Sequence, residues 1–99
     1  MLKSLVDITD EDLLEIKNMA AVFFTPKQIA TALEIDQASF IEECRQEGSN
    51  CYLAFEGGRL LSEFELRTSI VKLAKSGSSP AQTMALEMLK TSTMKMMET

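Results

Sequence analysis

The chain has 99 residues, of which 45% are hydrophobic and 25% are charged, a balance typical of one globular domain rather than of a disordered chain. Its net charge is −5, which argues against a strongly basic surface and against tight, non-specific binding to nucleic acid. The chain has no histidine, and its two cysteines are too few for a disulfide framework. No apolar run approaches the ~20 residues that span a bilayer, and no basic-then-apolar signal opens the chain. We therefore expect a cytoplasmic protein with reduced thiols and no membrane partner.

The first expected helix begins at Thr9 or Asp10, in the stretch TDEDLLEIKNMAAVFF. Acidic residues fill its first turn, where the helix dipole favours them. Apolar residues recur every three or four positions, which predicts one apolar face. That face comprises Leu13, Ile16, Met19, Ala20 and Phe23. We expect this helix to pack across the next two, with Phe23 and Phe24 anchoring the corner that follows it.

Residues 25–46, TPKQIATALEIDQASFIEECRQ, have the pattern of two short helices joined by a tight turn, the helix-turn-helix motif. Thr25 and Gln28 are predicted to form a capping box around Pro26, which suits the first helical position. Asp36 is predicted to cap the second helix. The residues expected to close the motif are Ala30 at the helix crossing, Ile35 in the turn, and Phe40, Ile41 and Cys44 on the second helix.

Two residues depart from this pattern: Glu34 occupies the turn, where glycine is usual, and Glu43 occupies a position that is commonly apolar. In a helix-turn-helix, the outer side chains of the second helix reach base edges while neighbouring groups hold phosphates. Gln37 could read adenine, and Arg45 could read guanine or hold a phosphate. Carboxylates at Glu42 and Glu43 oppose DNA, so useful binding would need several copies acting together. The predicted DNA-binding residues are Lys27, Gln28, Gln37, Ser39, Arg45 and Gln46.

Residues 50–75 contain no proline and are predicted to form one helix of about 26 residues. Gly57 and Gly58 each weaken it by about 1 kcal/mol, so a kink or break there is the main alternative. At about 100° per residue the helix has two apolar faces rather than one. One face comprises Tyr52, Phe55, Leu66, Ile70 and Leu73, and the other comprises Leu53, Gly57, Leu60, Phe64 and Val71.

A helix with two apolar faces needs two partners, of which a following helix can supply only one. Because monomers rarely expose a large apolar patch, we expect the chain to form a homo-oligomer. The predicted interface residues are Leu53, Leu60, Phe64 and Val71. The alternative is that the N-terminal helices hide part of this stripe.

The last helix is predicted to begin at residues 78–80, Ser-Ser-Pro, after Gly77. It should fold back as an antiparallel hairpin, with its tail, TSTMKMMET, frayed. Five of the seven methionines lie between Met84 and Met97, either as flexible core filling or as an adaptable surface for another protein. The predicted packing face is Ala81, Met84, Ala85, Met88 and Leu89.

Residues that would carry catalysis do not form a recognisable constellation. The sequence has no nucleophile with a base, no glycine-rich phosphate loop and no metal-ligand spacing, so we expect no enzymatic activity, no cofactor and no metal. Cys44 and Cys51 are too far apart for a CxxC motif and are predicted to be buried, structural thiols.

Together these patterns predict an all-α protein of five helices. Residues 1–48 would form a three-helix helix-turn-helix unit, and residues 49–99 a long antiparallel helical hairpin that serves oligomerisation.

Two stretches, TPKQIATALEIDQASF and ELRTSIVKLAKSGSSPAQTMALEML, occur in an order that resembles the small subunit of phage terminase. In that family a helix-turn-helix precedes a long helix that ends in an alanine-glycine turn, followed by a helix that opens with alanine. Leu73, Ala74, Gly77 and Ala81 match this turn, and the resemblance covers about two thirds of the chain. The acidic second helix departs from the family's expectation.

The resemblance implies a non-enzymatic, oligomeric protein that recognises viral DNA in the host cell cytoplasm and directs it to a packaging motor, the large terminase subunit or a similar partner. Two alternatives remain open. One is a helical protein-protein adaptor that retains the motif only structurally, and the other is a small helix-turn-helix transcriptional regulator.

Overall fold

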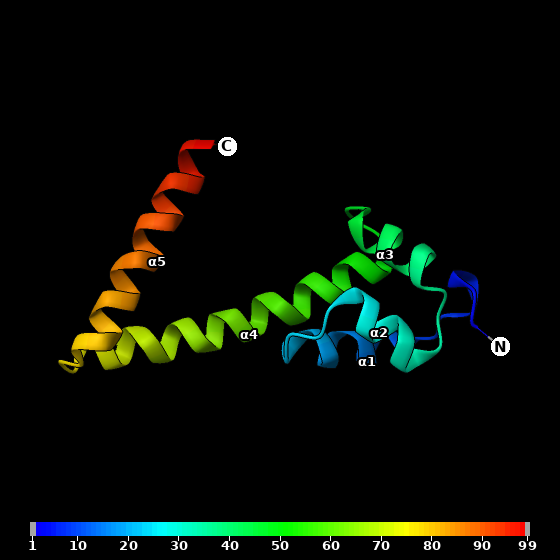
Figure 1. Ribbon diagram of the computed structural model, residues 1–99, viewed down its shortest axis with the longest axis horizontal. Helices are drawn as coiled ribbons and strands as arrows, with labels where there is room; N and C mark the ends of the chain where they lie inside the picture. The colour runs from blue at the N-terminus through cyan, green and yellow to red at the C-terminus, as the bar shows by residue number, and fades with distance from the viewer. Residues whose placement is uncertain (1, 99) are drawn as a thin grey trace. The chain divides into compact units, whose positions relative to one another are not determined.

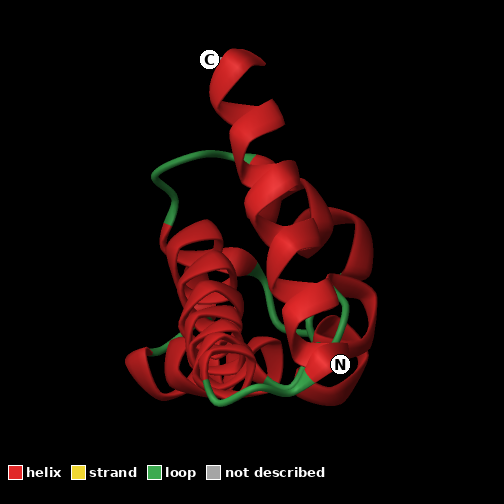
Figure 2. Cartoon of the chain, turned by 90° about the vertical axis from the view of Figure 1, so that its left-hand side faces the viewer, coloured by secondary structure: helices red, strands yellow, loops and turns green. Residues whose placement is uncertain are grey.

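The computed structural model describes residues 2–98, and within them the chain forms five α-helices and no strand (Figure 1). The helices are joined by short loops (Figure 2). Their bounds are α1 Asp10–Ala21, α2 Pro26–Leu33, α3 Gln37–Arg45, α4 Asn50–Lys75 and α5 Ser79–Glu98, preceded by a short 3-10 helix, Leu5–Asp7. The predicted all-α class and the five predicted helices are confirmed.

Contacts along the chain divide it into two units, Met1–Ser62 and Glu63–Thr99, which are described separately below. The boundary falls within α4, so the first half of that helix belongs to the first unit and the second half to the hairpin. The functional division at residues 48 and 49 stays a prediction.

The helix starts in the first unit are fixed by side-chain caps. Thr9 Oγ1 accepts a hydrogen bond from the Asp12 backbone N–H at 3.1 Å, and the Asp12 carboxylate accepts one from the Thr9 N–H at 3.0 Å. Thr25 and Gln28 form the same reciprocal box at the start of α2, at 3.2 and 2.9 Å. The Asp36 carboxylate accepts the Ser39 N–H at 3.0 Å and caps α3. These caps satisfy backbone donors that have no partner within a helix, and those at Thr25 and Asp36 confirm the predictions.

A single apolar core fills the first unit. Ala30 is fully buried, which confirms that a small side chain stands where α2 and α3 pack together. Ile35 fills the turn between these two helices, as predicted. The buried members of the core are Ile16, Ala20, Ile29, Ala30, Ile35, Phe40, Cys44, Cys51 and Phe55.

Helices α1 and α4 touch at Gly58, a contact that the sequence did not predict. A Cβ atom at Gly58 would collide with the Lys17 carbonyl oxygen and would lie 3.2 Å from the Ala20 Cβ. Only a hydrogen atom fits between the two backbones here. The alternative of a break at Gly57 and Gly58 is wrong, because α4 runs unbroken through both glycines.

The N-terminal segment holds the turn of the helix-turn-helix, a role that no sequence pattern indicated. The Lys3 backbone N–H donates to the Glu34 carbonyl oxygen at 2.7 Å, in an isolated bridge between Lys3 and Ile35. The Lys3 ammonium contacts both carboxylate oxygens of Asp12 at 3.0 Å. The pKa of Asp12, which is largely buried, is lowered mainly by the hydrogen bond from the Thr9 backbone and next by the one from Lys3.

The corner between α1 and α2 differs from the expected arrangement. Phe23 and Phe24 do not anchor it, because their side chains are 53% and 42% exposed. Instead α1 ends in a Schellman motif: the Phe23 N–H donates to the Ala20 carbonyl at 3.0 Å, and the Phe24 N–H donates to the Met19 carbonyl at 3.2 Å. Phe23 adopts φ +70° at the position that usually takes glycine, which costs a residue with a Cβ about 1–2 kcal/mol.

The second unit is a helical hairpin made of the end of α4 and of α5, joined by a turn at residues 76–78 in which Gly77 has φ +104°. The predicted hairpin is confirmed. Close packing lies beside the turn, where Ala81 is buried and the Gln82 amide donates to the Ala74 carbonyl at 3.1 Å. Met84 and Leu89, which were expected on the packing face, are exposed, and Ala85 and Met88 are half-buried. The tail does not fray as expected, because α5 continues to Glu98.

Candidate nucleic-acid interface

The predicted DNA-binding side chains belong to the start of α2 and the outer side of α3. All six are exposed in the first unit, so they lie outside the core that holds the motif together. They are Lys27, Gln28, Gln37, Ser39, Arg45 and Gln46.

The two glutamines nearest to the helix starts already have partners. Gln28 closes the capping box with Thr25, so its side-chain oxygen serves the fold rather than a ligand. The Gln37 amide donates to the Thr31 hydroxyl at 2.8 Å, and that hydroxyl donates to the Lys27 carbonyl at 3.0 Å. This short chain of hydrogen bonds fixes Gln37 at the start of α3 beside α2.

Glu42 engages two further candidates, Arg45 and Gln46, at the end of α3. Its carboxylate accepts a hydrogen bond from the Gln46 amide at 3.3 Å and lies 3.8 Å from the Arg45 guanidinium. The two charged side chains are 73% and 64% exposed, so their ion pair is worth at most about 1 kcal/mol and is easily broken. The carboxylate that was expected to oppose DNA therefore also neutralises the arginine that was expected to bind it.

The charge balance of the motif is acidic. Residues 25–50 contain five acidic side chains against two basic ones, Lys27 and Arg45. The Lys27 ammonium has no ion pair or hydrogen bond within residues 2–98. The Ser39 backbone N–H lowers the pKa of Asp36, which keeps that capping carboxylate ionised.

A shallow groove of about 350 Å³ brings the two basic residues of the motif to one place. Lys27 reaches it from α2 and Arg45 from α3, and Phe55 and Glu56 reach it from α4. Arg59 lies 3.7 Å from Glu56 and 6.0 Å from the centre of the Phe55 ring. The sequence did not indicate that α4 takes part in this surface, because that contact depends on how the helices cross. The remaining lining residues are Thr25, Pro26, Ile41 and Cys44.

The two thiols lie in the core of the first unit, and the prediction that they are buried is confirmed. The pKa of Cys44 is raised to about 12, mainly because burial removes the thiol from water. The nearby Cys51, Glu43 and Glu56 raise it further, because a negative thiolate beside them is unfavourable. Burial likewise raises the pKa of Cys51. Both side chains therefore stay protonated at neutral pH, where a thiol is a poor nucleophile.

The predicted oligomer interface lies on α4, and its four side chains are only partly covered by the chain itself. Leu53 and Leu60 are exposed in the first unit, and Phe64 and Val71 are 67% and 37% exposed in the second. The self-association that this stripe suggested stays a prediction.

Among the described residues, histidine, cysteine and acidic side chains do not gather in a group of three that could hold a metal ion. None of the helices within residues 2–98 combines the length and apolarity needed to cross a bilayer. Comparisons of the chain with protein-family models, with curated proteins and with solved structures gave no match.

Proposed function

We propose that the protein is a non-enzymatic DNA-recognition protein, similar to a viral small terminase subunit, that acts as an oligomer and directs DNA to a packaging motor. The observation that carries the proposal is the geometry of α2 and α3. Two capped helices pack through Ala30 and Ile35 and leave the polar outer side of α3 free for a duplex. This is the arrangement with which helix-turn-helix proteins place a recognition helix in the major groove.

Phosphate contacts would come from Lys27 and Arg45, since these cations reach one groove from two different helices. Lys27 has no competing ion pair among residues 2–98, and Arg45 would exchange a weak pair with Glu42 for a charge-assisted contact. Gln37, whose amide nitrogen donates one hydrogen bond to Thr31, would meet a base edge with the rest of its amide group, and a glutamine amide suits adenine.

Affinity per copy would be low, because five carboxylates accompany the two cations of the motif. Several linked copies overcome this, since each additional contact becomes intramolecular once the first copy is bound. The exposed stripe of Leu53, Leu60, Phe64 and Val71 is the surface that we propose for self-association.

Fluorescence anisotropy with duplex DNA from the neighbouring genomic region tests the proposal. We expect Arg45→Ala to weaken binding and to reduce its salt dependence, because one phosphate contact is lost. Glu42→Gln should strengthen binding, since it releases Arg45 and removes a repelling charge. Lys17→Ala is the matched control: it removes an exposed lysine of α1 that does not line the groove.

Equal and negligible effects of Arg45→Ala and Glu42→Gln would overturn the DNA proposal. They would favour the second candidate, a helical adaptor that binds protein. The acidic balance of the motif favours that candidate.

A further inference from the structure

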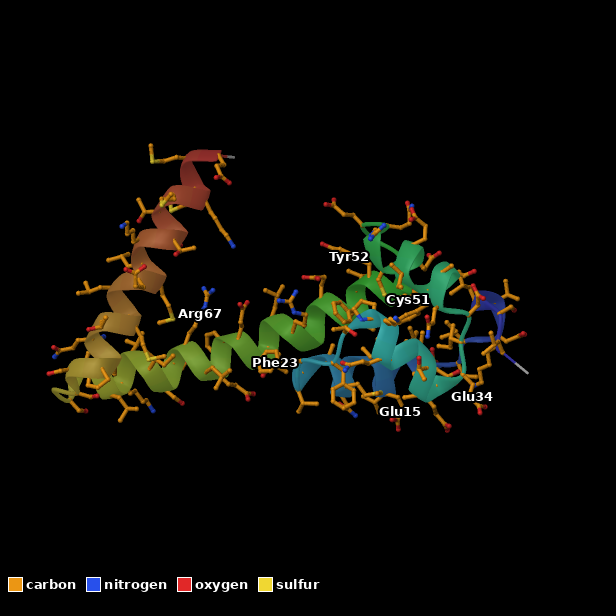
Figure 3. All side chains as sticks on the ribbon, viewed as in Figure 1. Glu15, Phe23, Glu34, Cys51, Tyr52 and Arg67 are labelled. Carbon is orange, nitrogen blue, oxygen red and sulfur yellow. The ribbon has the colours of Figure 1, made fainter. Side chains whose placement is uncertain are left out.

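The corner after α1 combines a strained backbone with exposed apolar side chains. Phe23, labelled in Figure 3, follows the end of α1. It is the left-handed residue of the Schellman motif, with φ +70°. A bulky residue in this conformation is a genuine outlier. Val22, Phe23 and Phe24, which we call the aromatic corner, all expose large parts of their side chains.

Packing within the chain does not explain the aromatic corner. None of its three side chains belongs to the core of the first unit, where Ala20, three residues before Phe23, is fully buried. Because no packing within the first unit offsets the backbone strain at Phe23, the strain suggests that this residue has a role outside the fold. Exposed aromatic side chains on a rigid turn are the usual anchors of protein-protein contacts.

The hairpin carries an apolar groove that could receive such an anchor. It has a volume of about 320 Å³ and lies beside the turn between α4 and α5. Its apolar walls come from both helices, and Lys75 and Gln82 supply polar groups at its edge. The lining residues, which we call the hairpin groove, are Val71, Ala74, Lys75, Gln82, Ala85 and Leu86.

The two surfaces belong to units of opposite charge. Residues 1–62 contain eleven acidic and five basic side chains, a net charge of −6, whereas residues 63–99 contain four acidic and five basic ones, a net charge of +1. The last turn of α1 has no basic residue to offset the negative end of its dipole. Lys75 at the groove is a cation that suits this helix end.

We propose that the aromatic corner of one copy inserts into the hairpin groove of a second copy. The inference rests on the proposed self-association and adds to it a second contact, which shares only Val71 with the stripe on α4 and without which the copies do not assemble. The two surfaces differ, so the contact is heterologous: each copy offers one corner and one groove, and repetition gives a ring if it closes and a chain if it does not. A function in assembly explains why phenylalanine, rather than glycine, occupies the strained position.

Three variants test the contact by light scattering coupled to size-exclusion chromatography. Phe23→Gly removes the anchor and should therefore yield monomers. It also relieves the backbone strain, so these monomers should melt a few degrees above monomers of the unmodified chain. Leu86→Glu places a charge in the groove and should also yield monomers, since Leu86 is exposed in the chain itself. Leu14→Ser is the control, because it removes another exposed apolar side chain of α1 outside the aromatic corner.

Mixing Phe23→Gly with Leu86→Glu is the decisive step. The first variant keeps an intact groove and the second an intact corner, so the mixture should form one-to-one dimers that neither variant forms alone. A mixture that stays monomeric overturns the corner-in-groove contact, as does a Phe23→Gly variant that assembles like the unmodified chain. An unmodified chain that is monomeric at all concentrations overturns both this inference and the proposed self-association.

Discussion

The two units of the chain bury their apolar side chains to very different extents. The first unit surrounds residues such as Ile16 and Phe40 completely, whereas the hairpin buries only Ala81 among its described residues. Its leucines, methionines and Phe64 remain largely exposed. Most of the stability of a helix in a protein comes from packing its apolar face, and α5 packs little of that face within the hairpin. The first unit therefore has an extensive apolar core of its own, whereas the hairpin exposes the apolar surface on which we base the proposed self-association.

The largest expected difference between the units comes from shortening one phenylalanine in each. Phe40→Ala empties a fully buried site and should cost about 3–5 kcal/mol of unfolding free energy. Phe64→Ala, at a side chain that is 67% exposed, should cost less than about 0.5 kcal/mol in the monomer. Urea unfolding below the concentration of assembly measures both. Similar losses for the two variants would show that the hairpin has a core of its own.

Adjacent glycines in α4 provide a finer test of the packing in the first unit. Gly58→Ala should cost about 2–3 kcal/mol, because the added methyl group forces α4 away from the Lys17 backbone. Gly57 has no atom within 4 Å of its would-be Cβ, so Gly57→Ala should stabilise the helix by up to about 1 kcal/mol. Thermal melts of both variants give the comparison. A stabilising Gly58→Ala would contradict the close contact between α1 and α4.

Acid should weaken the first unit through Asp12. The pKa of this carboxyl is lowered in the folded chain, so its ionised form stabilises the fold. That contribution is complete above the ordinary aspartate value of about 3.9 and is lost as the pH falls through the lowered folded value. Asp12→Asn should cost about 1–2 kcal/mol at neutral pH, because Lys3 loses its charged partner.

Urea unfolding at neutral pH and at about pH 3 measures this effect. The variant should lose less stability on acidification than the unmodified chain does. Asp10→Asn, at an exposed position of the same first turn, is the control. Equal acid sensitivity of the Asp12 variant and the unmodified chain would show that another carboxylate dominates.

The smallest expected effect concerns the turn of the helix-turn-helix. Glu34 adopts φ +56°, and glycine at this position should stabilise the unit by about 0.5–1 kcal/mol, because the relief of strain exceeds the entropy that glycine adds to the unfolded chain. The hydrogen bond from Lys3 to the Glu34 carbonyl uses only backbone atoms and should survive. Chemical unfolding of Glu34→Gly measures the gain, and a loss of stability would show that the glutamate side chain supports the turn.

Local patterns were sufficient to predict the helices and their caps. Thr25, Gln28 and Asp36 act on neighbours only three residues away, and Ala30 and Ile35 occupy fixed positions of a known motif. Helix periodicity also indicated that α4 has more apolar surface than one partner can cover.

Contacts between distant residues were not predictable in the same way. Lys3 forms hydrogen bonds with Glu34 and Asp12, which lie in separate segments of the chain. A helical repeat relates only residues of one helix, so it does not predict such contacts. From its helix propensity alone, Gly58 would only weaken α4. Its role in the packing depends on the Lys17 backbone, which passes close to it and is not visible in the sequence of α4. Phe23 matched the apolar spacing of α1, yet α1 ends at Ala21, and the residues after its end no longer follow helical spacing.

Hydrogen exchange at low and high protein concentration tests most directly the claim that the first unit is complete and the hairpin is not. At low concentration the amides of α3 should exchange only with global unfolding, while those of the second half of α5 should exchange through frequent local opening. Raising the concentration should protect α5 far more than α3, because assembly suppresses the local opening of α5, whereas α3 gains only the smaller increase in the global stability of the first unit. Amides in α5 that are as well protected as those in α3 at every concentration would contradict the account.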